Sequence, residues 1–413
     1  MSQDTTATRA IDVLRIPDVR RWILARLAAG TAASMLRAIV LWQVYQATHS
    51  AAYLGLVGLL QFLPSPVASL LGGAAADSRD RRHLVLAAQS LTLIVALVLA
   101  VGTHLERLPT AALFVLVVVV AIATAFEAPA RQAMLPSLVP SEAFQRAVTV
   151  FATAQALAFM AGPALGGLVI AELGVSVASG VVVALYAGSM LLVLRVGARP
   201  IAGRRAVGLE GLLEGLRFLR SQPAILGAMS LDLFAVVFGG ATALLPVFAE
   251  DVLRVGARGY GLLSASLEIG ALATSLLLVV LPPIRRIGRA IVLSVVAYGL
   301  ATIAFGLSTS FPLSVAAYVF VGMADQVSVV CRSTLVQLST PDALRGRVSS
   351  VNMIFIVASN QLGAAEAGFV AALTSPRTAV VFGGSMVLVV VAIVVATLPS
   401  LLRYRSGGIA QGS

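Results

Sequence analysis

The stretch that decides the fold reads FEAPARQAMLPSLVPSEAFQRAV over residues 126–148 and continues through an apolar run to GPALGG at residues 162–167. Within it, Glu127 and Arg131 stand one helical turn apart inside a hydrophobic segment. Charged side chains are costly inside a membrane and usually have a function there. This pair is therefore the first candidate for a functional site.

The same stretch has a counterpart in the second half of the chain. Adding 201 to the residue number brings together Arg131 with Arg332, Pro140 with Pro341, Arg146 with Arg347, Gly162 with Gly363 and Gly167 with Gly368. One offset near half the chain length indicates a duplicated architecture. Internal repeats of this size are typical of secondary transporters.

Composition favours a membrane protein. The 413 residues are 59% hydrophobic and only 11% charged, whereas a soluble protein has about 25% charged residues. Few aromatic and many small residues favour packed helices over a β-barrel. All 29 basic residues are arginine, so the chain lacks the lysine of a P-loop ATP site. We expect no cofactor, no metal site and no nucleic-acid binding.

Apolar segments between charged or Pro/Gly breaks predict an all-α polytopic fold with twelve transmembrane helices, since about 20 apolar residues span a bilayer. The predicted spans are 22–47, 53–76, 84–104, 109–135, 143–171, 174–195, 224–249, 259–282, 288–309, 311–338, 348–373 and 378–400.

Arginine distribution predicts the orientation. With the N-terminus inside, 21 of the 29 arginines fall in cytoplasmic tails and loops, as the positive-inside rule requires. Both termini are then cytoplasmic. The predicted parts are a tail (1–21), a six-helix bundle (22–195), a linker with an amphipathic helix (196–222), a second six-helix bundle (223–402) and a tail (403–413).

A motif follows the second span. Gly73, Asp77, Arg81 and Arg82 are spaced as in the GxxxDRxGRR signature, and the chain thereby resembles the major facilitator superfamily. Ser78 and Asp80 depart from that signature. The variant form is similar to the subgroup of enterobactin exporters and macrolide- or tetracycline-type efflux proteins. The resemblance implies two pseudo-symmetric bundles, and we expect Gly73 to allow a close helix approach there.

A second motif lies in the fifth span. Gly162, Pro163, Gly166 and Gly167 resemble the antiporter signature gxxxGPxxGG, with Ala158 in place of its first glycine. In that family the signature is associated with export. Proline bends the helix, and the glycines let another helix close on it.

Most charges inside spans fall on spans one, four, seven and ten, which line the central cavity in the fold that the chain resembles. The proton-coupling candidates are Glu127, Asp232 and Asp325, and Arg37, Arg131 and Arg332 complete the candidate substrate cavity. Glu127 is expected to pair with Arg131, and Asp325 is a possible partner of Arg332. Arg37 has two candidate partners, an anionic substrate group and Asp232, whereas Arg26 is expected at the inner interface. Glu268 and Glu366 are secondary candidates.

These features predict a monomeric, non-enzymatic, proton-coupled exporter in a bacterial inner membrane. It would move amphipathic small molecules such as drugs, siderophores or secondary metabolites by alternating access, in contact with membrane lipids. A lipid or lysolipid translocase of the same fold is the alternative.

Overall fold

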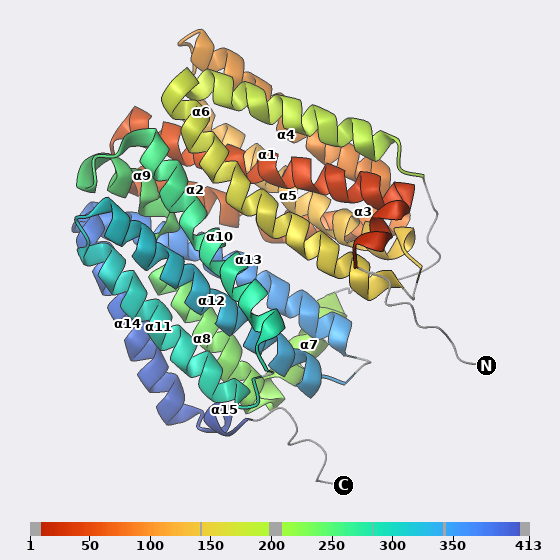
Figure 1. The fold of residues 1–413 in the computed structure, drawn as a ribbon, viewed down its shortest axis with the longest axis vertical. Helices are drawn as coiled ribbons and strands as arrows, with labels where there is room; N and C mark the ends of the chain where they lie inside the picture. Colours follow the sequence, from red (N-terminus) through yellow and green to blue (C-terminus); the bar gives the residue numbers. More distant parts are fainter. Residues whose placement is uncertain (1–9, 141–142, 198–208, 283, 342–343, 405–413) are drawn as a thin grey trace. The chain divides into compact units, whose positions relative to one another are not determined.

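The chain is helical over the residues that the computed structural model describes, namely 10–140, 143–197, 209–282, 284–341 and 344–404 (Figure 1). Within these ranges there is no β-strand, and eleven helices are long and apolar enough to cross a membrane. The predicted all-α membrane fold is therefore confirmed. The twelve predicted spans correspond to eleven long helices because two of the spans belong to one helix.

That helix is α6, Phe144–Leu194, whose 51 residues would extend to about 77 Å as a straight helix, far beyond a bilayer. Gly174 interrupts it with φ 83° and ψ 170°, a conformation open to glycine and strained for other residues. The two limbs of α6 fold back at this point (Figure 1). They correspond to the fifth and sixth predicted spans.

The other span limits agree with the prediction within a few residues, where the seventh span, Pro223–Val252, includes the short segments that follow its main helix. The remaining long helices are α1 (Pro17–Thr48), α2 (Ala51–Phe62) with α3 (Ser65–Ser78), α4 (Arg81–His104), α5 (Thr110–Leu138), α8 (Pro223–Gly239), α10 (Gly256–Val280), α11 (Ile287–Leu307), α12 (Phe311–Ser339), α13 (Arg345–Leu373) and α14 (Pro376–Thr397). The described elements also include 3-10 helices at Ala10–Arg15 and Ala241–Leu244, the short helices α9 (Leu245–Val247) and α15 (Ser400–Arg403), and a π-helix at Phe248–Val252.

The chain divides into two compact units. Unit 1 comprises residues 1–40 and 64–206, and unit 2 comprises residues 41–63 and 207–413. The predicted bundle boundaries followed chain order, whereas residues 41–63 group with the second half. The reason is a close approach of α2 to α13, where a Cβ on Gly55 would lie 2.9 Å from the Ala365 carbonyl oxygen.

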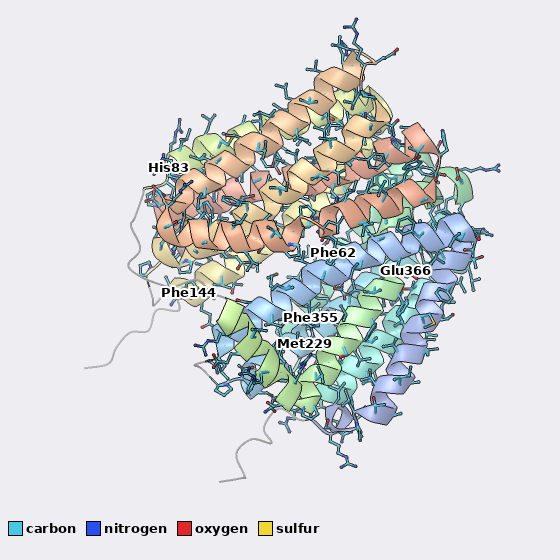
Figure 2. All side chains as sticks on the ribbon, turned by 180° about the vertical axis from the view of Figure 1, so that it is seen from behind. Phe62, His83, Phe144, Met229, Phe355 and Glu366 are labelled. Carbon is cyan, nitrogen blue, oxygen red and sulfur yellow. The ribbon has the colours of Figure 1, made fainter. Side chains whose placement is uncertain are left out.

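Small residues at such helix contacts replace the hydrophobic drive that is missing inside lipid. Large apolar side chains instead project from the outer faces of the helices (Figure 2). Leu276, Leu293 and Leu373 are among them, and each is strongly exposed. This pattern is the inverse of a soluble globule and fits a lipid solvent.

The amphipathic helix predicted in the linker is present as α7, Leu209–Ser221. Residues 198–208 of the predicted linker lie outside the described residues. Within unit 2, Arg347 at the start of α13 forms an ion pair with Glu214 at 2.6 Å. A Cβ on Gly215 would lie 2.9 Å from the Arg347 carbonyl oxygen. This helix thus packs across the first turn of α13.

Candidate functional site: buried ion pairs within each unit

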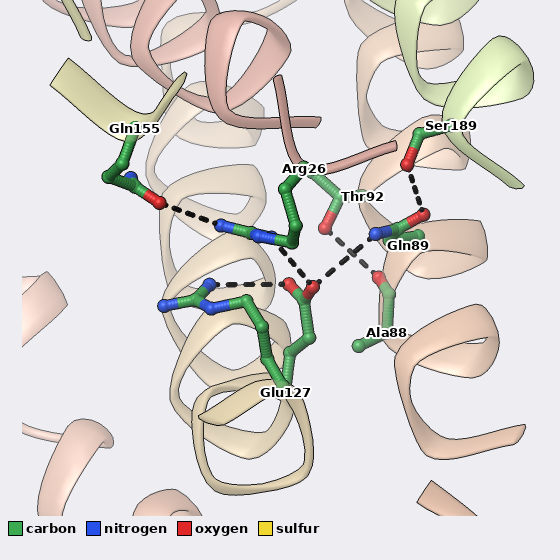
Figure 3. A network of polar contacts seen from close by, with 8 residues as sticks. Arg26, Ala88, Gln89, Thr92, Glu127, Gln155 and Ser189 are labelled. Carbon is green, nitrogen blue, oxygen red and sulfur yellow. Dashed lines mark hydrogen bonds and ion pairs between the residues drawn. The ribbon is translucent and has the colours of Figure 1, made fainter. Parts of the chain in front are cut away.

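Glu127 on α5 lies at the centre of a buried polar network in unit 1 (Figure 3). Its carboxylate oxygens lie 3.5 Å from an Arg26 guanidinium nitrogen and 3.9 Å from an Arg131 nitrogen. The Gln89 side-chain amide donates to the same carboxylate at 3.4 Å. Glu127 is 9% exposed and Arg26 is 4% exposed. The predicted Glu127–Arg131 pair is present, with Arg26 as a second and closer cation.

Neutral polar groups extend this network to both limbs of α6. Arg26 donates to the Gln155 side-chain oxygen at 3.1 Å, and Ser189 donates to the Gln89 side-chain oxygen at 3.1 Å. Four helices, α1, α4, α5 and α6, are thereby connected through one carboxylate (Figure 3). Leaving a buried charge unpaired is costly, so the network fixes these helices against one another.

The expectation that Arg26 reaches the inner interface is wrong. That prediction rests on the position of Arg26 near the start of α1. The direction of the side chain is instead decided by the helix face on which Arg26 lies. Arg26 faces α5, where Glu127 offers a carboxylate, and its guanidinium lies 6.0 Å from the centre of the Phe151 ring. A paired interior position is then preferable to a path along the helix toward water.

Unit 2 contains a second buried ion pair, between Asp232 on α8 and Arg332 on α12. Asp232 is 8% exposed and Arg332 is 3% exposed. The predicted pairing of Arg332 with Asp325 is therefore wrong. Seven residues of helix separate those two by about 10 Å along the axis, which is a long reach for a short aspartate. Arg332 instead meets the acid of the neighbouring helix.

Asp325 is left beside a small cavity. Asp232, Tyr298 and Ser328 line this cavity together with Asp325, and the space open to the centre of a water molecule is about 10 Å³. That is room for about one water. Among the described residues, Asp325 forms no ion pair or hydrogen bond. It is thus the one proton-coupling candidate of the three without a cationic partner in the described part of the chain.

The two ion pairs connect repeat-equivalent helices with opposite polarity. α1 and α5 are the first and fourth spans of their half, and α8 and α12 are the seventh and tenth spans overall. In unit 1 the arginine stands on the first span and the acid on the fourth. In unit 2 the acid stands on the first span and the arginine on the fourth. Each unit thus ties the same two helices together with reversed charges.

The remaining charged candidates lie outside these networks. Arg37 is exposed on α1, and Asp232, one of its predicted partners, pairs with Arg332. Glu268 on α10 and Glu366 on α13 are partly buried, and Glu366 is labelled in Figure 2. Within the described ranges, no group of three metal-ligating side chains is present.

The GPALGG motif forms the contact between α6 and α1. A Cβ on Gly162 would lie 2.7 Å from the Thr31 carbonyl oxygen and 2.7 Å from the Met35 amide nitrogen. Ser34 donates a hydrogen bond across this contact to the Ala158 carbonyl oxygen at 2.9 Å. Gly166 and Gly167 are buried, and Pro163 lies inside the helix. The motif therefore lets α1 and α6 approach at backbone distance.

The departure from the signature at Ala158 is matched on the other helix. A Cβ on Gly30 would lie 2.9 Å from the Ala158 Cβ. The glycine missing from α6 thus has an equivalent on α1, and the contact stays close. Sequence reasoning considered α6 alone and could not locate this partner.

The loop motif stabilises helix ends in unit 1. Arg82 donates to the carbonyl oxygen of Val196 at 3.0 Å and to that of Leu194, at the end of α6. Arg81 donates to the Ala133 carbonyl oxygen at 3.1 Å. Asp80, a departure from the signature, caps α4 by accepting from the Arg82 amide at 2.9 Å. Cations at helix C-termini are favourable.

Gly73 and Asp77 are the remaining members of this motif. The predicted close approach at Gly73 is wrong, because a Cβ there would meet nothing within 4 Å. The neighbouring Gly72 faces α5 instead, where a Cβ would lie 2.6 Å from the Phe126 carbonyl oxygen. The Asp77 side chain lies outside the described residues, so its place in the motif stays a prediction.

Known proteins share this architecture along the whole chain. The family model of transmembrane secretion effectors matches residues 12–403. The enterobactin exporter EntS of Escherichia coli O1:K1 is 27% identical over 390 residues, which cover 94% of this chain and 94% of that protein. The enterobactin exporter EntS of Escherichia fergusonii is also 27% identical over 390 residues.

Solved transporter structures share the fold at low identity. The nucleoside transporter NupG aligns with a TM-score of 0.68 and 17% identity over 94% of this chain and 99% of that chain. A bacterial homologue of the human lysosomal transporter Spinster aligns with a TM-score of 0.70 and 14% identity over 95% of this chain and 98% of that chain. The matched proteins are membrane transporters and not enzymes, and the chain itself belongs to the transmembrane secretion effector family of the major facilitator superfamily.

Proposed function

We propose that this membrane transporter exports amphipathic small molecules, among them siderophores, in exchange for protons. The observation that carries the proposal is the contrast among the buried acids. Glu127 and Asp232 each have an arginine partner, whereas Asp325 stands beside a water-sized cavity without one in the described residues. A carboxyl group that gains and loses a proton must exchange it with water and must not be held permanently ionised.

In this scheme the three acids have different roles. Glu127 and Asp232 hold helices together, and Asp325 carries the proton. The enterobactin exporters named above support export as the direction and a siderophore as one substrate class. The contact of α1 with the GPALGG motif supports the same direction, because the resembling signature is associated with export.

The experiment uses purified protein in proteoliposomes that enclose a pH-sensitive dye, with enterobactin as the probe substrate. We expect the wild type to move protons when enterobactin is added, and Asp325→Asn to abolish this proton movement while it still binds enterobactin. For Glu127→Gln and Asp232→Asn, the main expected effect is a lower thermal stability. Full proton coupling in Asp325→Asn would reject Asp325 as the carrier.

The same preparation separates the two substrate classes. A lipid translocase would bind a lysophospholipid saturably and would show no proton movement with enterobactin in the wild type. That result would favour the lipid alternative and would overturn the small-molecule assignment. A monomer measured in detergent by light scattering would agree with one chain as the working unit.

Membrane orientation is part of the proposal, and arginine distribution supports a cytoplasmic location of both termini. Cys331 is the one cysteine of the chain, so Cys331→Ser provides a background for single-cysteine labelling in whole cells. A membrane-impermeant maleimide should label Glu106→Cys and should leave Arg403→Cys unlabelled. The reverse pattern would invert the topology.

A further inference from the structure

We propose that unit 2 contains a binding site for an anionic phospholipid at the N-terminal end of α11. A cavity of about 520 Å³ lies there, lined by Arg286, Arg289, Arg403, Pro399 and Leu402. This volume is in the range of sites for small molecules and headgroups. Three arginines, a proline and a leucine thus line one space.

Contacts of α15 with α11 and α12 hold the walls of this cavity in place. Gly288 lies against Leu401 of α15, and a Cβ on Gly288 would overlap the Leu401 carbonyl group. The Tyr404 hydroxyl and the Ser339 hydroxyl are 2.8 Å apart, which ties the end of α15 to α12. Leu401 is buried. Arg403 is therefore held beside α11 by a packed turn.

Charge in the cavity is unbalanced. No ion pair involves any of its three arginines within the described residues. Three like charges around one cavity repel one another, and an anion among them removes that repulsion. Arginine is suited to phosphate because its planar fork donates two parallel hydrogen bonds. The site therefore fits a group with one or more phosphates.

An exposed apolar stripe leads away from the arginines along α11. Leu293, Leu300 and Leu307 are 67%, 54% and 65% exposed. They follow Arg286 at intervals of seven residues, and such positions stay on one helix face with a drift of about 20° per interval. Acyl chains of a lipid whose headgroup occupies the cavity would cover this stripe. A free phosphate would make no contact with this stripe, so the stripe favours a phospholipid.

Orientation agrees with this ligand. The loop before α11 is one of those that arginine distribution assigns to the cytoplasm, and basic pockets on that side of membrane proteins bind phosphorylated lipid headgroups. Two phosphates would satisfy three arginines better than one. Cardiolipin, with two phosphates, is accordingly the first probe, and phosphatidylglycerol, with one, is the second.

The test measures lipid binding to the detergent-purified full chain by native mass spectrometry. We expect Arg286→Gln/Arg289→Gln/Arg403→Gln to bind cardiolipin at least about tenfold more weakly than the wild type, because charge-assisted hydrogen bonds are lost. The matched control removes three exposed arginines outside the cavity, Arg20→Gln/Arg217→Gln/Arg220→Gln. Its affinity should stay within about twofold of the wild type, since no bonds to the lipid are lost.

Three outcomes would overturn the proposal. The first is equal weakening in both triple variants, which would mean diffuse attraction to cytoplasmic arginines. The second is displacement of cardiolipin by inorganic phosphate at equal concentration, which would assign the site to a free anion. The third is unchanged cardiolipin binding in the cavity variant. Arg403→Gln alone serves as a milder variant near the chain end if the triple variant is unstable.

Discussion

The buried pair of Asp232 and Arg332 permits a quantitative test of its role. Arg332→Gln would leave Asp232 uncompensated at 8% exposure. Removing one partner of a buried pair costs about 3–5 kcal/mol, whereas replacing both by neutral groups is often close to neutral. We therefore expect Arg332→Gln to be strongly destabilised and Asp232→Asn/Arg332→Gln to recover most of the loss.

The expected change in Tm follows from the size of unit 2, which contains about 230 residues. Unfolding entropy near 2.1 cal/mol/K per residue makes 1 kcal/mol equivalent to about 2 °C. The single variant should thus unfold about 6–10 °C below the wild type. The double variant should lie within about 3 °C of it. The swap Asp232→Arg/Arg332→Asp, which gives unit 2 the polarity of unit 1, should behave like the double variant.

Thermal unfolding in detergent, followed by tryptophan fluorescence and by static light scattering, provides the assay. A double-mutant cycle from the four proteins gives the coupling energy between the two side chains. A coupling energy near zero, with the double variant as unstable as the sum of the singles, would refute the ion pair as a fastening between α8 and α12. In that case the swap variant should also lose as much stability as the two single variants together.

Other contacts make separate predictions. Gly162→Ala should lower stability by about 1–3 kcal/mol because its Cβ would enter the α1 backbone. The control Gly180→Ala, where nothing lies within 4 Å of the added Cβ, should be neutral or slightly stabilising. The Tm values of the two variants test this difference. Tyr45→Phe should cost about 1.5–3 kcal/mol, since the hydroxyl donates to the charged Asp251 within unit 2. Combining Tyr45→Phe with Asp251→Asn should add little, and a fully additive loss in Tm would contradict the hydrogen bond.

Sequence alone predicted the spans, the duplication and the helices that carry buried charge. Hydropathy suffices for the spans and one offset in residue number suffices for the duplication, because neither depends on which helix faces pack together. Pairing was harder to predict. Spacing along one helix identified Glu127 with Arg131 but could not find Arg26, since a partner on another helix depends on which faces pack together. The same limit produced the wrong pairing of Arg332 with Asp325.

Two glutamines of the network were also missed. Gln89 and Gln155 stand inside otherwise apolar spans, and an uncharged amide there needs hydrogen-bond partners as much as a charge does. Their presence was a usable signal. Gly30 gave no such signal, because its role appears only when Ala158 is known to face it.

The reversed polarity explains why the repeat does not carry the acids of the two ion pairs onto one another. An offset of 201 carries Glu127 onto Ser328 and Thr31 onto Asp232, so neither acid has an acidic equivalent. An ion pair is equally favourable when its two members exchange helices. The physical requirement on each unit is therefore one buried ion pair between its first and fourth spans, and the residue at one repeat position is free to change. Once Arg332 is satisfied by Asp232, an acid at position 328 is not needed, and Ser328 is available to line the cavity beside Asp325.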